Sequence, residues 1–253
     1  MKTTSAAPER IGLYGIEGSG KTKAIAEISA QYRQSDTPGT FHWITAEPNS
    51  ITRLSDGYPD FWDNNKMHKF AGWVDLRSVT TEVLSLSTDA DWICVENSDR
   101  HWQLVRDTYD EYRAKRDGIQ LHDMFEIMPP DEDRGRWDRI NPEYYRWFDS
   151  LWGEGNPAHL MMTAPQTQVV LAGPKSKWED SKDLQALYLH HGFRPDTQKA
   201  WSARMHTVLW MQRPRVGEWT MTSIKDRERE LLQDAPVLTF PMSYLLRVGG
   251  WEL

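Results

Sequence analysis

Cysteine is almost absent from this sequence, and long apolar runs are missing as well. Cys94 is the only cysteine, so no disulfide can form within the chain and no thiolate cluster can hold a structural metal. The first ten residues contain no apolar stretch of the signal-peptide type, and no run of about 18 apolar residues occurs anywhere. We therefore expect a soluble protein of a reducing, cytoplasmic compartment that has no membrane as a partner.

An excess of positive charge is also lacking. The formal net charge of −7 argues against a basic surface that binds duplex nucleic acid non-specifically, although it is compatible with a local basic groove. Hydrophobic residues make up 39% of the 253 residues and charged residues 26%, which is an ordinary globular composition rather than that of a disordered or fibrous chain. We expect one domain over residues 1–253, with a long loop or insertion at about 117–140.

A glycine-rich segment follows the first apolar stretch of the chain. It fits the phosphate-binding pattern GxxxxGK[ST] and reads Gly15, Ile16, Glu17, Gly18, Ser19, Gly20, Lys21, Thr22. Residues 10–15 before it are typical of a buried strand, and residues 21–32 after it of a helix. The glycines allow backbone amides to point at phosphate oxygens, Lys21 adds a charge, and Thr22 offers a hydroxyl to Mg²⁺. The segment predicts a nucleoside triphosphate with Mg²⁺, and ATP is favoured because no guanine-selecting motif is present.

Two carboxylates stand where strands are expected to end. Glu96 closes the apolar run 91–96 and is the candidate second ligand for Mg²⁺, unless it merely opens the following turn. Glu47 closes a predicted strand over residues 40–47 and is the candidate that orients the attacking water. The alternative for Glu47 is an exposed acid at the end of a strand.

An amide completes the predicted set. Gln166 is expected to end a strand that begins at His159 and to sense the γ-phosphate by hydrogen bonding. An ordinary loop amide is the other interpretation of this residue.

Strands and helices alternate along most of the chain. Further helices are predicted near residues 75–87, 100–116, 141–152 and 184–190, a third strand near 67–74, and a final helix at the C-terminus. Two late strands, near residues 207–212 and 219–224, are expected to form an antiparallel edge. The pattern indicates an α/β fold with a mostly parallel central sheet flanked by helices and with ligands bound at the carboxyl ends of the strands.

Together these residues resemble RecA-type P-loop ATPases, in particular the phage-encoded ATP-binding proteins related to single-strand-annealing ATPases. The resemblance is carried by the phosphate loop, Glu47, the run 92–98, the strand ending near Gln166, and residues 224–227. It implies a RecA-like fold and, for a phage protein, the host cytoplasm. Glu96 stands where the family usually has Asp, which leaves the rate of turnover open.

The same resemblance implies a site shared between subunits. Lys225 and Arg227 would act on the γ-phosphate held by a neighbouring subunit, in a homo-oligomeric ring or filament. Because charges alternate along residues 225–230, a solvated surface is the alternative.

Single-stranded DNA is the nucleic acid that the resemblance implies. The loop following the Glu96 strand is acidic and poorly suited to phosphates, but a later loop contains Lys175, Lys177 and Trp178, which offer cations and a ring for base stacking. A solvated loop is the alternative, because Glu179 and Asp180 follow.

We therefore expect an enzyme that binds and hydrolyses ATP with Mg²⁺ and acts on single-stranded DNA in recombination, repair or replication. The alternative from another class is a nucleotide-dependent switch or assembly factor with a protein partner and little turnover. A small-molecule kinase is less favoured, since no arginine-rich lid follows the core. The histidines show no spacing typical of a zinc site, and a serine-hydrolase motif is missing.

Overall fold

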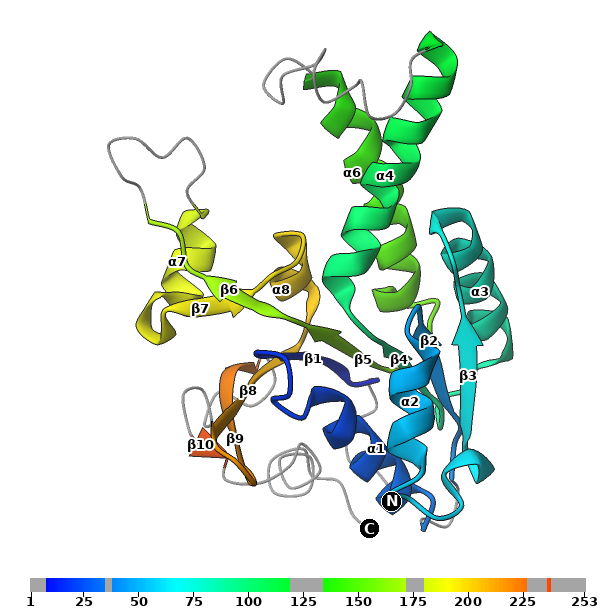
Figure 1. The fold of residues 1–253 in the computed structure, drawn as a ribbon, viewed down its shortest axis with the longest axis vertical. Coiled ribbons are helices and arrows are strands. Elements are labelled where there is room, and N and C mark those ends of the chain that lie inside the picture. The colour runs from blue at the N-terminus through cyan, green and yellow to red at the C-terminus, as the bar shows by residue number, and fades with distance from the viewer. Residues whose placement is uncertain (1–7, 35–37, 119–133, 172–179, 227–235, 238–253) are drawn as a thin grey trace.

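The computed structural model describes residues 8–34, 38–118, 134–171, 180–226 and 236–237. Their largest feature is an eight-stranded sheet in the order β10-β9-β8-β1-β5-β4-β2-β3 (Figure 1). Its strands are β1 (Arg10–Tyr14), β2 (Phe41–Thr45), β3 (Asn65–Lys69), β4 (Trp92–Val95), β5 (His159–Ala164), β8 (Thr207–Arg215), β9 (Glu218–Asp226) and β10 (Pro236–Val237).

Helices fill most of the connections between these strands. They are α1 (Lys21–Tyr32), α2 (Pro48–Ser55), α3 (Trp73–Leu86), α4 (Ser98–Asp117), α6 (Arg134–Trp152), α7 (Lys182–Tyr188) and α8 (Ala200–Arg204), with short 3₁₀ turns η1 (Phe61–Asp63) and η3 (Leu189–His191). A separate antiparallel pair consists of β6 (Gln166–Gln168) and β7 (Phe193–Pro195). Among the described residues, no helix is both long and apolar enough to cross a membrane.

Six neighbouring strands of the sheet, β3, β2, β4, β5, β1 and β8, are parallel to one another. At the other edge, β9 pairs antiparallel with both β8 and β10. Tyr14 at the end of β1 is level with Ala164 of β5 and Trp210 of β8, so the carboxyl ends of these strands share one edge. This confirms the predicted α/β class, the mostly parallel sheet flanked by helices, and the antiparallel edge near the C-terminus.

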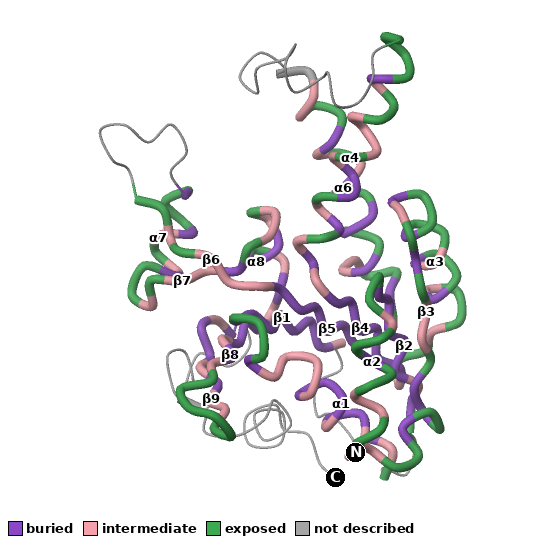
Figure 2. The backbone as a smooth tube through the Cα atoms, in the orientation of Figure 1, coloured by how far each residue is buried: buried purple, intermediate pink, exposed green. Residues whose placement is uncertain are grey.

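The sheet separates two apolar cores, and its central strands are buried along their length (Figure 2). Side chains of α1 and α2, such as Ile25 and Ile51, pack on one face against Leu13 and Trp43. On the opposite face α3, α4 and α6 build a core rich in aromatic rings, in which Tyr144 contacts the rings of Trp73, Trp102, Trp147 and Phe148. These contacts use several of the chain's 13 tryptophans for packing, as expected for large apolar rings.

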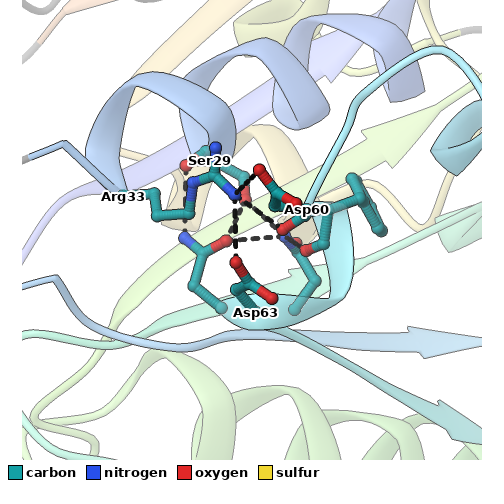
Figure 3. Close-up of polar contacts among 7 residues, drawn as sticks. Ser29, Arg33, Asp60 and Asp63 are labelled. Atoms are coloured by element: carbon teal, nitrogen blue, oxygen red, sulfur yellow. Dashed lines mark hydrogen bonds and ion pairs between the residues drawn. The ribbon is translucent and has the colours of Figure 1, made fainter.

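Polar contacts fix the end of α1 to the segment that leads into β3 (Figure 3). Arg33 forms ion pairs with Asp60 and Asp63, at 3.4 and 3.2 Å. Ser29 accepts a hydrogen bond of 2.6 Å from the side-chain amide of Asn65. Because α1 begins at the glycine-rich segment, these contacts hold the helix that carries Lys21 and Thr22.

The region around α6 differs from the sequence prediction. A helix was expected to begin at Asn141-Pro142, yet α6 begins at Arg134, and Pro142 lies inside it. Tertiary packing overrides the cost of the missing amide hydrogen, since Trp137 stacks on Trp102 of α4 at 5.9 Å and Arg136 forms an ion pair with Asp110. Part of the loop predicted at 117–140 is therefore helical, and the predicted final helix lies outside the described residues.

Candidate phosphate-binding site

The glycine-rich segment connects β1 to α1, as the sequence predicts. Gly18 and Gly20 have φ angles of 73° and 88°, in the left-handed region that other residues adopt at a cost. Gly15 is required for another reason, because a Cβ there would lie only 2.1 Å from the carbonyl oxygen of Met211 in β8. The backbone thus curls at the carboxyl edge of the sheet and leads into the N-terminus of α1, which is an arrangement that binds anions.

The ammonium group of Lys21 lies over this loop. Its Nζ donates hydrogen bonds of 2.9 Å to the carbonyl oxygens of Gly15 and Ile16. Burial lowers the pKa of Lys21, while the negative charges of Asp99, Glu17 and Glu96 oppose that shift. The loop therefore carries a partly buried cation, as the site of a phosphate requires.

Glu96 is the centre of a hydrogen-bond network that joins β4, the loop and β2. It follows the last residue of β4 and is 4% exposed. The hydroxyl of Thr22 donates to Oε1 at 2.7 Å, and the hydroxyl of Thr45 donates to Oε2 at 3.1 Å. Burial raises the pKa of Glu96, whereas the bonds from Thr22 and Thr45 lower it. Each carboxylate oxygen thus has a fixed donor.

Thr22 and Glu96 present hard oxygen atoms at one point beside the loop. Mg²⁺ prefers such ligands and takes only one or two from the protein when phosphates supply others, so this pair fits the ion. Within the described ranges there is no cluster of three or more His, Cys, Asp or Glu that could hold a metal by itself. The pair is therefore suited to a metal that arrives with a phosphate ligand.

Glu47 lies at the same edge but outside the strand in which it was predicted. β2 ends at Thr45, and Glu47 is an exposed residue directly before α2. Its backbone N–H donates to Thr45 Oγ1 at 2.9 Å, and its charge raises the pKa values of Glu96 and Asp99. β2 borders β4 rather than β1, so Glu47 is on the Glu96 side of the loop.

The prediction that Gln166 ends the strand starting at His159 is wrong. β5 stops at Ala164, and after Pro165 the chain enters β6, whose first residue is Gln166. Pro165 lacks the amide hydrogen that would continue the pairing of β5. Gln166 Oε1 accepts a hydrogen bond of 2.9 Å from Trp210 Nε1, so its side-chain oxygen already has a partner within the chain.

Lys225 is placed by contacts within its own chain. Its ammonium donates to the backbone oxygens of Ser202 and Met205, at 2.6 and 2.7 Å, around the end of α8. It pairs with Val208 near the start of β8, away from the carboxyl edge. Its action on a neighbouring subunit stays a prediction. Arg227, Lys175, Lys177 and Trp178 lie outside the described residues.

Sequence reasoning missed several groups at this edge. Thr45 bridges Glu96 and Glu47, and Asp99 has a buried Oδ1 without a hydrogen-bond partner in the described part of the chain. Asp99 also lines a cleft of about 560 Å³ between α4 and residues 194–199. The only hint for Asp99 was its position three residues after Glu96. The contacts of Thr45 depend on strand order, for which the sequence offered no direct signal.

A comparison of the sequence with protein-family models and with curated proteins found no match.

Proposed function

We propose that this protein is a Mg²⁺-dependent ATPase of the RecA type that acts on single-stranded DNA. One observation carries the proposal: the Thr22 hydroxyl, at the end of a glycine-rich loop, is bonded at 2.7 Å to the buried carboxylate of Glu96. A hydroxyl and a carboxylate that meet beside such a loop are the two protein ligands that Mg²⁺ needs when it enters with a nucleotide. The RecA-type assignment rests on the sequence resemblance and is compatible with the mostly parallel sheet.

Each group at this edge has a role in the proposed reaction. The loop amides and Lys21 bind the phosphates, and Thr22 and Glu96 hold the ion, which neutralises charge developing on the phosphate oxygens. Glu47 is exposed and two residues beyond β2, where it orients a water molecule for attack on the γ-phosphate. Its backbone bond to Thr45 couples its position to Glu96.

The cleft beside Asp99 supports the assignment of single-stranded DNA. Its lining contains one large ring and more cations than carboxylates, although Arg194 is already paired with Asp180 at 2.8 Å: Arg100, Arg106, Arg194, Lys199, Asp99, Asp196 and Trp102. Cations beside an aromatic ring suit a single strand, because the cations contact phosphates and the ring stacks on a base. The negative charge of Asp99 raises the pKa of Lys21, so the cleft adjoins the proposed ATP site.

The proposal includes assembly into a ring or filament, in which Lys225 or Arg227 would reach the γ-phosphate held by a neighbouring subunit. Lys225 holds the end of α8 in its own chain, so Arg227 is the better candidate to reach a neighbouring subunit. An arginine suits this task, since its guanidinium binds phosphate oxygens in pairs.

The test measures ATP binding and phosphate release with and without single-stranded DNA, for the wild type and for Lys21→Ala. We expect hydrolysis by the wild type that rises with DNA, and loss of both binding and hydrolysis in Lys21→Ala. Lys66→Ala is the control, because it removes an exposed lysine of β3, the edge strand of the sheet farthest from the β8–β9 hairpin, while retaining Lys21.

Each outcome of this test decides one part of the proposal. ATP binding without phosphate release in either condition would favour the switch with a protein partner. No binding of ATP by the folded wild type would overturn the proposal altogether, and hydrolysis that ignores DNA would remove the single strand from it.

A further inference from the structure

The order of the strands indicates on which side of β1 the nucleoside end of the proposed nucleotide lies. Lysines of phosphate loops reach the β- and γ-phosphates of a nucleoside triphosphate. The γ-phosphate end of the proposed nucleotide therefore lies near Lys21 and Glu96. Glu96 follows β4, which lies on one side of β1, whereas β8 and β9 lie on the other side (Figure 1). A triphosphate with its γ end near Glu96 therefore extends its nucleoside end away from β4, toward the β8–β9 hairpin.

Two side chains of that hairpin lie against the loop. A Cβ on Gly20 would be 3.0 Å from Cδ1 and 3.1 Å from Nε1 of Trp219, so the indole edge faces this glycine. A Cβ on Gly18 would be 3.6 Å from a terminal nitrogen of Arg213. Glycines at both positions let these side chains come close to the curled backbone.

Trp219 and Arg213 form a small cationic and aromatic cluster with Lys23. The guanidinium carbon of Arg213 is 5.6 Å from the centroid of the Trp219 ring, and Lys23 Nζ is 4.5 Å from it. Arg213 is exposed and forms no ion pair with a carboxylate of the described residues. A planar guanidinium next to an indole is a surface on which a nucleobase stacks.

The indole N–H of Trp219 is a second observation that points to a ligand at this position. Its Nε1 is buried and has no hydrogen-bond acceptor within the described part of the chain. Buried donors are almost always paired in folded proteins. Because this N–H lies beside Gly20, an oxygen of a bound nucleotide would meet it.

We propose that Trp219 and Arg213 bind the nucleoside half of the nucleotide, and that they favour a purine. This inference rests on the proposed function and adds to it the groups that distinguish a nucleotide from a bare chain of phosphates. The base stacks beside the Arg213 guanidinium and the Trp219 ring, and the indole N–H donates to a ligand oxygen. Purines are favoured because their larger rings cover more of this surface than pyrimidine rings do.

The experiment compares the affinities of the full chain for ATP, UTP and inorganic tripolyphosphate, by calorimetry and by competition. Trp219→Ala is expected to weaken ATP binding roughly 5- to 100-fold and Arg213→Ala roughly tenfold, from the usual strength of base stacking. Both variants retain wild-type affinity for tripolyphosphate, and their preference for ATP over UTP falls toward one. Lys21→Ala weakens the binding of ATP and of tripolyphosphate together.

Two further variants act as controls. Arg215→Ala removes an arginine of the same hairpin whose side chain is 81% exposed and lies 3.9 Å from Glu218, and it is expected to leave all three affinities unchanged. Trp219→Phe retains a ring but lacks the indole N–H, so it is expected to weaken ATP binding less than Trp219→Ala does. If Trp219→Ala does not fold, Arg213→Ala decides the question, because its side chain is exposed.

The outcomes separate this inference from the proposed function. If Trp219→Ala and Arg213→Ala weaken ATP and tripolyphosphate equally, or weaken neither, the hairpin only packs on the loop and the inference is wrong. If the wild type binds neither ATP nor tripolyphosphate, the proposed function has failed first.

Discussion

Glu96 and His101 are two buried titratable residues only five positions apart, and their surroundings differ completely. Glu96 accepts hydrogen bonds from Thr22 and Thr45, one for each carboxylate oxygen. The two ring nitrogens of His101 have no hydrogen-bond partner in the described residues, and its ring packs against Phe70 and Trp147 at 5.4 and 5.1 Å. Burial raises the pKa of Glu96 and lowers that of His101 to about 3.

The surroundings of these two residues distinguish the candidate site at the sheet edge from the apolar core. At the carboxyl edge of the sheet, hydroxyl groups from two elements, Thr22 of α1 and Thr45 of β2, are directed at one carboxylate, as expected of a candidate binding site. On the buried side of α4, His101 packs as an aromatic ring and stays neutral. Burial alone thus does not identify a functional group in this protein, whereas convergent donors do.

The largest expected effect is that of Glu96→Gln on ATP hydrolysis. The amide has nearly the same shape but lacks the negative charge that would bind Mg²⁺ in the proposed reaction, so we expect turnover to fall on the order of 100-fold or more. Phosphate-release assays at saturating ATP measure the change. Glu82→Gln, the same exchange at an exposed position of α3, serves as the control. Full turnover by Glu96→Gln would show that ATP hydrolysis does not need the Glu96 carboxylate.

Thr45→Val is expected to destabilise the fold by about 2 kcal/mol, because a buried carboxylate loses a hydroxyl donor and the Glu47 N–H loses its acceptor. Valine has almost the same shape as threonine, so packing is preserved. Denaturant unfolding measures the loss, and Thr45→Ser, which retains the hydroxyl, should recover most of the stability. Equal stability of the valine variant and the wild type would show that Glu96 does not need this donor.

The smallest effect at neutral pH is expected for His101→Phe, and it grows as the pH drops. Since the pKa of His101 is about 3 in the folded chain and near 6.5 when unfolded, the unfolded chain binds more protons between these values. The free energy of unfolding of the wild type therefore falls as the pH drops through this range, and the variant lacks that contribution.

Unfolding of both proteins at pH 7.5 and pH 4.5 checks this prediction. We expect similar stability at the higher pH and a relative gain for His101→Phe of roughly 2 to 3 kcal/mol at the lower pH. His42 and His159, with pKa values lowered to about 4 and about 3 by burial, retain their own acid sensitivity in both proteins. A difference that does not change with pH would mean that His101 is protonated within the fold.

Much of the fold was predictable because its signals are local. The strand before the glycine-rich loop, the helix after it, the apolar run that ends at Glu96 and the late antiparallel pair all appear as the sequence indicated. One error arose where distant contacts decide the outcome, and another overlooked a local signal. α6 starts before Pro142 because it packs on α4, and β5 stops short of Gln166 because Pro165 ends the pairing.

The sequence by itself determined the glycine-rich loop, since glycine conformations, the lysine and the threonine act within eight consecutive residues. Only the tertiary structure decided which groups surround that loop. Thr45 reaches Glu96 across 51 positions of the chain, and the Trp219 ring lies against Gly20 from a strand at the other end of the sequence. Such neighbours follow from strand order and register, which depend on the packing of the whole sheet rather than on any local pattern.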